Sequence, residues 1–398
     1  MPAARPDPRS AREMAAVATV DTQRSLARWM PRLVAVWRRH RKLPAGPPVL
    51  VGRELKDVAQ GIRTLSAGLT RERSLVGARY LDDPRLLGAY LLFYWPVSYA
   101  QARAVLGELG RRPRTVLDLG SGPGPVAFAA LDAGATEVTA ADRSAPALAI
   151  ARALAAEAEE PLATRPWSRG AALPEGRFEL ISLGHVLNEL GRGPAALDER
   201  AALLERAAEQ LRPGGSLLVL EPALRETSRD LLAVRDRMVE RGFAIRAPCL
   251  WQGRCPALIK PTDWCHAERS WAPPPLLETL AREAGLHKEA LKMSYLLVAP
   301  RGEAWAKPPP GRLFRIVSEP LEGKGRQRFM GCGPEGRLGL ALQEKHRTAE
   351  NEAFFTLRRG DVVAVEGTEP RGDGLALVEG SRVRRVASAG QPFPATGE

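Results

Sequence analysis

The chain has 398 residues, 44% of them apolar, which is enough for two or three domains with hydrophobic cores. No run of 18 or more apolar residues occurs and the start of the chain lacks an apolar signal block, so we expect neither a transmembrane helix nor a secretory signal. The formal net charge of +12 is concentrated in residues 1–75, which hold 15 Lys and Arg against 6 Asp and Glu, whereas residues 76–299 hold 27 of each. A basic flank beside a neutral region favours an anionic partner such as RNA, and the alternative explanation is the Arg bias of a GC-rich genome.

The first part of the chain has the pattern of a basic helical region, which we place at residues 1–75. Apolar residues at helical spacing over residues 10–42 predict one amphipathic helix, or two with a break at Pro31. A second helix is expected near residues 55–68. Basic clusters supply our candidate phosphate contacts, for which a solvated basic face without a partner is the alternative. These candidates are Arg38, Arg39, Arg41, Lys42, Lys324, Arg326 and Arg328.

Strand and helix patterns alternate through residues 76–305, which we predict to be one domain. It begins with an apolar, aromatic stretch at residues 80–106 that is expected to be helical and buried. Strands separated by helices imply right-handed crossovers and a Rossmann-like, doubly wound parallel sheet, so the fold class is α/β. The expected strands are 115–118, 137–142, 163–167, 178–183, 216–221 and 291–298, and the expected helices are 126–133, 145–158, 198–210 and 275–284.

A second, smaller unit is predicted at residues 306–398. Three prolines and a glycine at 308–311 mark its boundary, and short alternating apolar runs follow. This pattern indicates a small antiparallel β module, barrel-like in form. The runs lie at 313–317, 338–342, 361–365 and 375–378.

A glycine-rich loop joins the first strand to the following helix. Glycines let the backbone turn tightly and approach a ligand, while the helix start offers free N–H groups and a positive dipole end. This suits the carboxylate end of S-adenosylmethionine, or a phosphate. An acid 22 residues after Gly120, at the tip of the second strand, can accept hydrogen bonds from ribose hydroxyls. The predicted cofactor contacts are Asp118, Gly120, Ser121, Gly122, Gly124 and Asp142.

Two other nucleotide motifs are excluded. Pro125 stands where the dinucleotide fingerprint requires a glycine, and no P-loop sequence occurs. Residues 112–222 instead resemble the class I methyltransferases, both in the glycine loop and in the turn at residues 211–215 before a strand. In that class the glycine loop and the acid after the second strand contact S-adenosylmethionine.

The same resemblance implies that residues 184–190, after the 178–183 strand, line the methyl-transfer site. His185, Asn188 and Glu189 are the candidate catalytic residues there. A histidine titrates near neutrality and can act as a general base, and the alternative is a polar helix-cap pair that only touches the cofactor. The segment lacks the Asn/Asp-Pro-Pro-aromatic tetrad of nucleobase amino-methyltransferases, and Cys249 lies too far along the chain to be a C5-methyltransferase nucleophile.

Four cysteines form the second constellation. All have proline- or glycine-rich, loop-like surroundings, unlike structural cysteines in apolar elements. Four thiolates can hold zinc or a 4Fe–4S cluster, and the absence of close Cys pairs favours the cluster. The alternative is four cysteines that bind no metal. Three tryptophans in residues 244–275, which we treat as a Cys-rich insertion, are expected to screen it: Trp251, Trp264 and Trp271. The candidate ligands are Cys249, Cys255, Cys265 and Cys332.

The combination of motifs resembles one family, the methyltransferase-like proteins of the small ribosomal subunit, known as mitochondrial assembly factors with bacterial relatives. The resemblance spans roughly residues 80–385 and rests on the 183–190 segment, Glu221-Pro222, Pro248-Cys249, Cys255-Pro256, Asp263–His266 and the distal Cys332. It implies 4Fe–4S binding, association with small-subunit ribosomal RNA, and a cytoplasmic location in bacteria against a mitochondrial one in eukaryotic relatives.

Three functions remain open from the sequence. The first is an RNA-directed methyltransferase, and the second is a non-catalytic, RNA-binding ribosome assembly factor that retains the cofactor pocket. The third is a small-molecule methyltransferase, which the basic N-terminal flank disfavours.

Overall fold

The structure is a computed structural model that describes residues 8–303 and 312–393, with side chains in the first helix from residue 21 onward. It begins with a long helix, α1, and the predicted break at Pro31 is absent. The proline is exposed, while Trp29, Leu33 and Trp37 on the opposite face are buried, so packing holds the helix together on both sides of it. The helical elements that precede the sheet are α1 (Pro8–His40), α2 (Gly52–Ser66), η1 (Ala67–Arg71), η2 (Tyr80–Asp82), α3 (Pro84–Ala89), η3 (Tyr90–Tyr94), α4 (Trp95–Leu106) and η4 (Gly107–Leu109).

The large sheet confirms the predicted α/β class. Its strand order is β3-β2-β1-β4-β5-β8-β6, with β7 paired to β8. The first five strands are parallel, whereas β8 runs antiparallel to β5, so the complete sheet is mixed. The strands are β1 (Thr115–Leu119), β2 (Glu137–Asp142), β3 (Leu162–Pro166), β4 (Phe178–Gly184), β5 (Leu211–Pro222), β6 (Ile245–Ala247), β7 (Ala267–Ser270) and β8 (Ala290–Val298).

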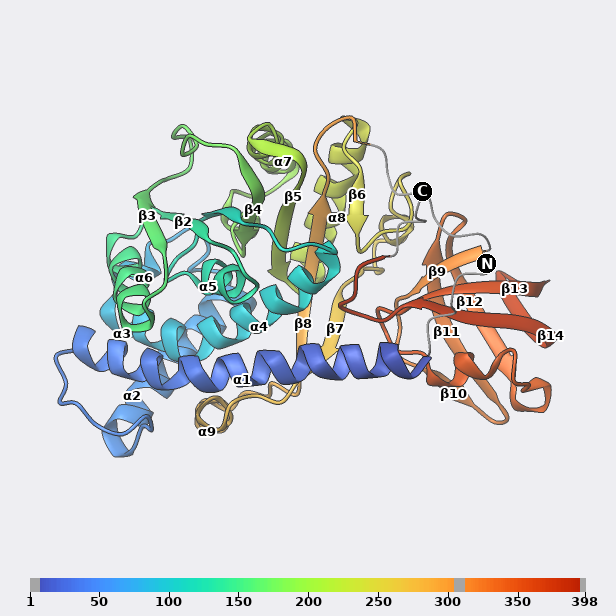
Figure 1. Cartoon of the computed structure of the whole chain (residues 1–398), viewed down its shortest axis with the longest axis horizontal. Coiled ribbons are helices and arrows are strands. Elements are labelled where there is room, and N and C mark those ends of the chain that lie inside the picture. The colour runs from blue at the N-terminus through green and yellow to red at the C-terminus, as the bar shows by residue number, and fades with distance from the viewer. Residues whose placement is uncertain (1–7, 304–311, 394–398) are drawn as a thin grey trace.

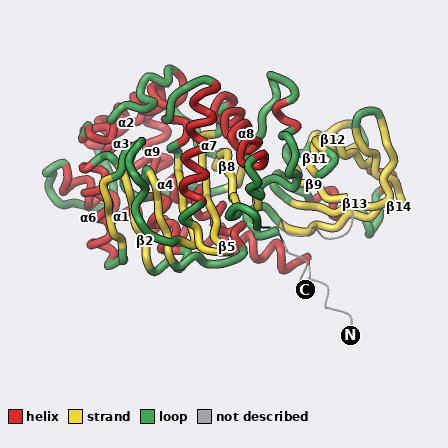
Figure 2. Tube along the Cα trace, turned by 90° about the horizontal axis from the view of Figure 1, so that it is seen from above, coloured by secondary structure: helices red, strands yellow, loops and turns green. Residues whose placement is uncertain are grey.

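Helices cover both faces of this sheet (Figures 1 and 2). One apolar core joins the sheet to α4, α5 and α6, and the other joins it to α7 and α8. Helix α1 packs outside the layer formed by α4, α5 and α6. There the ring centroids of Trp29 and Phe128 lie 4.7 Å apart, and the Trp29 Nε1 donates to Asp132 at 2.7 Å. The remaining helices are α5 (Pro125–Asp132), α6 (Ala145–Ala158), α7 (Pro194–Ala208), α8 (Arg225–Glu240) and α9 (Pro275–Ala284).

The C-terminal strands close into a barrel beside the large sheet (Figure 1). Strand β9 pairs with both β11 and β13, which completes the ring. The prediction of an all-antiparallel module is wrong in one place, because β12 and β14 are parallel. The elements are β9 (Arg312–Ile316), β10 (Leu321–Gly323), β11 (Arg326–Gly333), β12 (Gly336–Gln343), η7 (Glu344–His346), η8 (Glu352–Thr356), β13 (Val362–Arg371) and β14 (Gly374–Ala387).

No helix in the described part of the chain is long and apolar enough to cross a membrane.

Candidate functional site

The glycine loop follows β1 and leads into α5, as the sequence predicted. Gly120, Gly122 and Gly124 have φ values of +68°, +53° and +84°, a region that favours glycine. Asp142, at the end of β2, holds the loop: its Oδ2 accepts from the Gly122 N–H at 2.8 Å and its Oδ1 from the Ser144 N–H at 2.7 Å. The loop and the acid therefore form one hydrogen-bonded unit at the carboxyl edge of the parallel strands, where ligands bind in open α/β sheets.

A cavity of about 260 Å³ opens at this edge. Its walls come from five parts of the chain: the segment before α3, the first residue of η3, the glycine loop, the ends of β2 and β3, and the segment after β4. Among the predicted cofactor residues, Gly120, Gly122 and Asp142 line it. A side chain at Gly122 would place its Cβ 3.3 Å from Leu81 Cδ1, so glycine keeps this wall open.

Asp118, Ser121 and Gly124 do not line the cavity. Asp118 lies behind the loop, fully buried, where Oδ1 accepts from the Ser182 hydroxyl at 2.7 Å and Oδ2 from the Ala127 N–H at 3.1 Å. These contacts clamp β1 to β4 and to the start of α5. Burial raises the pKa of Asp118 to about 7, and the geometry makes it a residue that positions the loop.

The three candidate catalytic residues lie together after β4 but face different ways. His185 lines the cavity, has a φ of +61°, and its Nε2 lies 3.2 Å from Gln101 Oε1. Burial lowers the pKa of His185 to about 4, so the ring is neutral near pH 7 but is a weak base. Glu189 also lines the cavity, and its Oε1 accepts from the Tyr80 hydroxyl at 3.1 Å. Burial raises the pKa of Glu189 to about 7.

Asn188 turns away from the cavity. Its Nδ2 donates to the His185 carbonyl at 3.0 Å, and its backbone N–H donates to Glu221 Oε2 at 3.3 Å. Glu221, at the end of β5 and 1% exposed, also accepts from the Leu187 N–H at 2.8 Å. Asn188 and Glu221 thus hold the shape of the segment that carries His185 and Glu189.

Several residues of the cavity wall were not predicted. Tyr80, Tyr90, Arg143 and Trp167 line it although they lie outside the motifs. The aromatic stretch was correctly predicted to be largely buried, but nothing in its sequence shows which rings face a cavity. Arg143 follows the ribose-type acid directly, and its Nη2 donates to the Ala78 carbonyl at 2.6 Å, which joins the N-terminal segment to the cavity.

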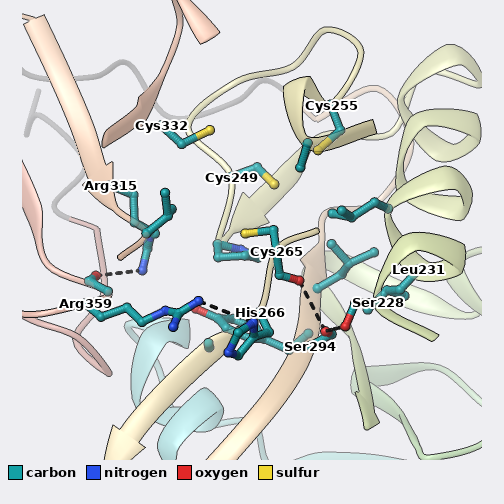
Figure 3. Close-up of a pocket in the computed structure, with 18 of the residues that line it drawn as sticks. Ser228, Leu231, Cys249, Cys255, Cys265, His266, Ser294, Arg315, Cys332 and Arg359 are labelled. Carbon is teal, nitrogen blue, oxygen red and sulfur yellow. Dashed lines mark hydrogen bonds between the residues drawn. The ribbon is translucent and has the colours of Figure 1, made fainter. Parts of the chain in front are cut away.

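All four cysteines line a second cavity, of about 70 Å³, which lies between the large sheet and the barrel (Figure 3). Cys249, Cys255 and Cys265 come from the segment between β6 and β7, and Cys332 comes from β11. Cys332 therefore lies on a strand, and the prediction of a loop there is wrong. In Figure 3 the four sulfur atoms point toward a shared space. The two cavities have no lining residue in common.

Arginines surround the cysteine cavity. Arg269, Arg315, Arg337 and Arg359 line it, and Arg235 acts electrostatically on Cys249 and Cys255. The Nε atoms of Arg235, Arg269, Arg315 and Arg359 are buried and have no hydrogen-bond partner among the described residues. Each of these four arginines also has a carboxylate within ion-pair distance. A buried N–H without an acceptor still costs free energy, so the unpaired Nε donors favour an additional acceptor here.

None of Trp251, Trp264 and Trp271 lines the cysteine cavity, so their expected screening of a cluster stays a prediction. Trp264 stacks on His266, with ring centroids 4.2 Å apart, and the Trp271 Nε1 donates to the Lys288 carbonyl. Within residues 8–303 and 312–393, no group of three or more His, Cys, Asp or Glu has the arrangement to hold a single metal ion.

One of the candidate phosphate contacts is wrong. Arg38 is 5% exposed, and its guanidinium donates to Glu54 Oε2 at 2.8 Å and to the Val49 carbonyl at 2.9 Å. It holds the turn between α1 and α2, so it cannot face an RNA backbone. Arg39 lies on the surface, where its Nη2 contacts Glu157 at 2.5 Å.

Several solved structures that are similar to the chain are described as methyltransferases or methylases. A proposed RNA methyltransferase from Pyrococcus horikoshii is 16% identical, with a TM-score of 0.34 over 52% of this chain and 85% of that one. The ribosomal protein L11 methylase of Lactobacillus delbrueckii subsp. bulgaricus is 16% identical, with a TM-score of 0.32 over 52% and 78%. A methyltransferase from Pyrococcus furiosus is 15% identical, with a TM-score of 0.34 over 50% and 81%. No curated protein matches the chain.

The sheet and the glycine loop define the class of the protein, a class I methyltransferase-like α/β protein. Its sequence matches the family described as "Mitochondrial small ribosomal subunit Rsm22" over residues 86–363, which is more than half of the chain. The chain belongs to this family, and the resemblance inferred from its motifs is confirmed.

Proposed function

We propose that the chain binds S-adenosylmethionine in the larger cavity. The loop at Gly120 and Gly122, beside the start of α5, would receive the carboxylate end, and Asp142 would accept hydrogen bonds from the ribose hydroxyls. Positive φ at both glycines, and the absence of a Cβ at Gly122, leave the space that such a ligand needs. The bound cofactor supplies an electrophilic methyl group. The observation that carries this proposal is that one cavity is lined by Gly120, Gly122 and Asp142.

The proposed partner is the small ribosomal subunit and its RNA. The family name refers to the mitochondrial small subunit, and the excess positive charge of the chain suits a polyanionic partner. For a bacterial relative, we propose that this association takes place in the cytoplasm, where ribosomal subunits assemble.

We also propose that Cys249, Cys255, Cys265 and Cys332 hold a 4Fe–4S cluster. The chemistry fits, because four thiolates around an iron–sulfur centre carry net negative charge, and the cavity is surrounded by buried arginines with unpaired donors. The thiols do not converge as the ligands of a single zinc ion do, at about 2.3 Å from one centre. A four-iron group is wider than one ion and suits thiols that stand further apart. The role of the cluster would be to join the barrel to the large sheet.

Two versions of the function compete at the larger cavity. The first is methyl transfer to RNA, in which His185 or Glu189 would receive a proton near the acceptor atom. The second is a non-catalytic assembly factor, and the contacts of the candidate residues favour it: His185 is paired with Gln101, Asn188 with the His185 carbonyl, and Glu189 with Tyr80. The family and the cavity are common to both.

Transfer of a labelled methyl group to purified small subunits separates the two. The experiment compares the wild-type chain with Asp142→Ala and Glu189→Gln variants, and each protein is also tested for co-sedimentation with the subunit. Methylation that both substitutions reduce, with co-sedimentation retained, supports the enzyme. Co-sedimentation without methylation by the wild-type chain supports the assembly factor, and the lack of both contradicts the proposed partner.

A further inference from the structure

The C-terminal barrel has a specific strand order. Apart from the short β10, its strands in chain order are β9, β11, β12, β13 and β14, and around the ring they pair first–second–third–fifth–fourth–first. The third and fifth strands are parallel, and all other pairs are antiparallel. The 3-10 turns η7 and η8 lie between the third and fourth strands. Phe354 of η8 is fully buried and packs edge-on against Phe329 inside the barrel, with the two ring centroids 5.2 Å apart. This is the topology of the oligonucleotide/oligosaccharide-binding barrel.

In barrels of this type the outer face of the second and third strands and the adjoining loops bind oligonucleotides. Topology alone does not assign a function, so the argument depends on which side chains this face presents. On β11 the buried Phe329 points inward, and the alternate positions Arg326 and Arg328 point outward. They lie opposite Gln343 and Ala341 of β12.

The middle of this face is shallow. Ala341 pairs with Ala376 of β14, and Gly339 pairs with Gly374. A Cβ added at Gly339 would meet nothing within 4 Å, so this strand position is open. On the β13 side of the strip, Arg371 pairs with Gly374 of β14. Arg326 and Arg328 of β11 lie on the other side, so cations flank the shallow strip on both sides. The acids of the same region include Glu322, Glu369, which pairs with Ala376, and Asp373 in the turn between Arg371 and Gly374.

The cations of this face differ from three exposed or half-exposed arginines of the barrel, whereas Arg358 and Arg384, also exposed, resemble them in having no carboxylate partner in the described part of the chain. Arg312, Arg347 and Arg382 are within ion-pair distance of Glu335, Glu352 and Glu350. Lys324, Arg326, Arg328 and Arg371 form no ion pair and no side-chain hydrogen bond with any residue that the structure describes. They are therefore available to an external anion, and their positions on both sides of an open strip fit a linear polyanion.

We propose that the outer face of β11, β12 and β14, with the β10–β11 hairpin, binds single-stranded RNA. The inference rests on the proposed association with ribosomal RNA and names the surface and the form of RNA. The phosphates lie against Lys324, Arg326, Arg328 and Arg371, and the bases lie over the strip of Gly339, Ala341 and Ala376. This strip offers no aromatic ring for stacking, so binding is mainly electrostatic and weakly selective in sequence. The extent of one such barrel corresponds to about 4–16 nucleotides.

The test measures fluorescence anisotropy of a labelled 12-nucleotide oligouridylate with the full-length chain, over a series of salt concentrations. With four phosphates neutralised, the logarithm of the affinity falls with the logarithm of the salt concentration with a slope of about −3. The double variant Arg326→Gln/Arg328→Gln lowers the affinity at least tenfold at low salt, and the slope becomes shallower by about 1.4. The matched control is Arg312→Gln/Arg347→Gln, which removes two ion-paired arginines of the same barrel that lie outside β11, β12 and β14, and leaves affinity and slope unchanged.

Equal effects of the two double variants would overturn the proposal, and so would a preference for a fully paired hairpin RNA over the oligouridylate. Thermal unfolding of each variant shows whether a loss of binding reflects a loss of folding, and a parallel series at Lys324→Gln/Arg371→Gln repeats the test with other residues of the face.

Co-sedimentation of the wild-type chain with small subunits is measured separately. If the chain binds subunits but the face variants bind oligouridylate normally, this surface is wrong and the proposed partner stands. If oligouridylate binding depends on the face but the chain does not bind subunits, the proposed partner is wrong and this surface stands.

Discussion

Arg315, on the first strand of the barrel, places its Nη1 3.3 Å from Oε2 of Glu108, which lies in η4 before the large sheet. The Glu108 side chain is 1% exposed. Its Oε1 also accepts from the Tyr295 hydroxyl at 2.8 Å and from Arg269 at 2.9 Å. One buried carboxylate thus connects the barrel, β7 and β8, and it does so beside the cysteine cavity, which Arg269, Tyr295 and Arg315 line.

Substitution of Glu108 should destabilise the chain strongly. Glu108→Ala leaves Arg269 and Arg315 buried without their shared partner, which costs about 3–5 kcal/mol in the free energy of unfolding. The measurement is urea denaturation of both proteins. The control is Glu335→Ala, which removes the half-exposed partner of Arg312 and should cost about 0–1 kcal/mol. If the two substitutions cost the same, the buried network does not hold the barrel.

Affinity for S-adenosylmethionine should depend on Asp142 and Gly122. Asp142→Ala removes both the predicted ribose acceptor and the hydrogen bond to the Gly122 N–H, and Gly122→Val puts a branched side chain at a φ of +53° against Leu81. Since hydrogen bonds to charged groups contribute about 1.5–3 kcal/mol each, we expect at least a tenfold loss by calorimetry. Gly302→Val is the matched control, because its φ is +78° but it lies in open space outside the cavity. Unchanged affinity in both cavity variants would contradict the proposed site.

The elements of the large sheet could be predicted where their apolar pattern is local. The predicted bounds of β2, α6 and α9 are those of the structure. Helix α8 (Arg225–Glu240) was missed because charged residues dominate it and its buried positions include polar groups such as Thr227 and Arg235. Its apolar side chains become significant only when they meet β5 and α7.

Strand β11 was missed for a different physical reason. Its inward positions Gly331 and Gly333 carry no side chain, so the alternation of apolar residues that identifies a strand is absent. The barrel requires this: a Cβ at Gly333 would lie 2.1 Å from the Leu313 carbonyl, and one at Gly331 would lie 3.0 Å from Phe314. The loop prediction for Cys332 follows from the same two glycines.

The predicted residues of the larger cavity came from a local motif, and the rest of its wall did not. The glycine loop and Asp142 are visible in the sequence because strand, turn and helix are contiguous. Tyr80 and Trp167 reach the cavity through long-range packing, which leaves no pattern in neighbouring residues. The sequence also does not show which way a side chain points. The position of Asp118 and Asn188 near the site could therefore be predicted, but their orientation away from the cavity could not.

Glu189 should make the stability of the chain depend on pH. Burial raises its pKa from the ordinary 4.5 to about 7, so between these values the folded chain holds a proton that the unfolded chain has released. The contribution is fully present below about pH 4.5 and is lost as the pH rises through about 7. Glu189→Gln stays neutral, so its advantage over the wild type should grow from near zero at about pH 4 to at most about 3 kcal/mol at about pH 8.

Denaturation midpoints of the two proteins across this pH range test the prediction. Asp118 and Glu221, whose pKa values burial also raises to about 7, are present in both proteins, so the difference between the curves isolates Glu189. The control Glu379→Gln changes an exposed residue of β14. A difference between wild type and Glu189→Gln that does not vary with pH would show that this carboxyl titrates alike in the folded and unfolded chain.

Loss of Cys332 should remove the cluster and loosen the barrel. Anaerobically purified wild type is expected to be brown, with about four iron atoms per chain. Cys332→Ser takes away the one proposed ligand that comes from the barrel, so the proposed link between β11 and the segment after β6 is lost with it. We therefore expect loss of iron and faster proteolysis beyond residue 311. S-adenosylmethionine affinity should stay within about twofold, because no residue lines both cavities.

The matched control for this substitution is Met330→Ser, two residues earlier on β11 and outside the cavity lining, which should retain its iron. Three metal analyses have different consequences, because the cysteines serve two proposed purposes. Iron that disappears only in Cys332→Ser supports both the cluster and its role in joining the barrel to the sheet. Colourless wild type with one zinc per chain would refute the cluster but keep the cross-link, since Cys332 would still supply a bond between β11 and the segment after β6. Wild type without metal, as resistant to protease as Cys332→Ser, would refute both, and Glu108 with its arginines would then be the contact that holds the two parts together.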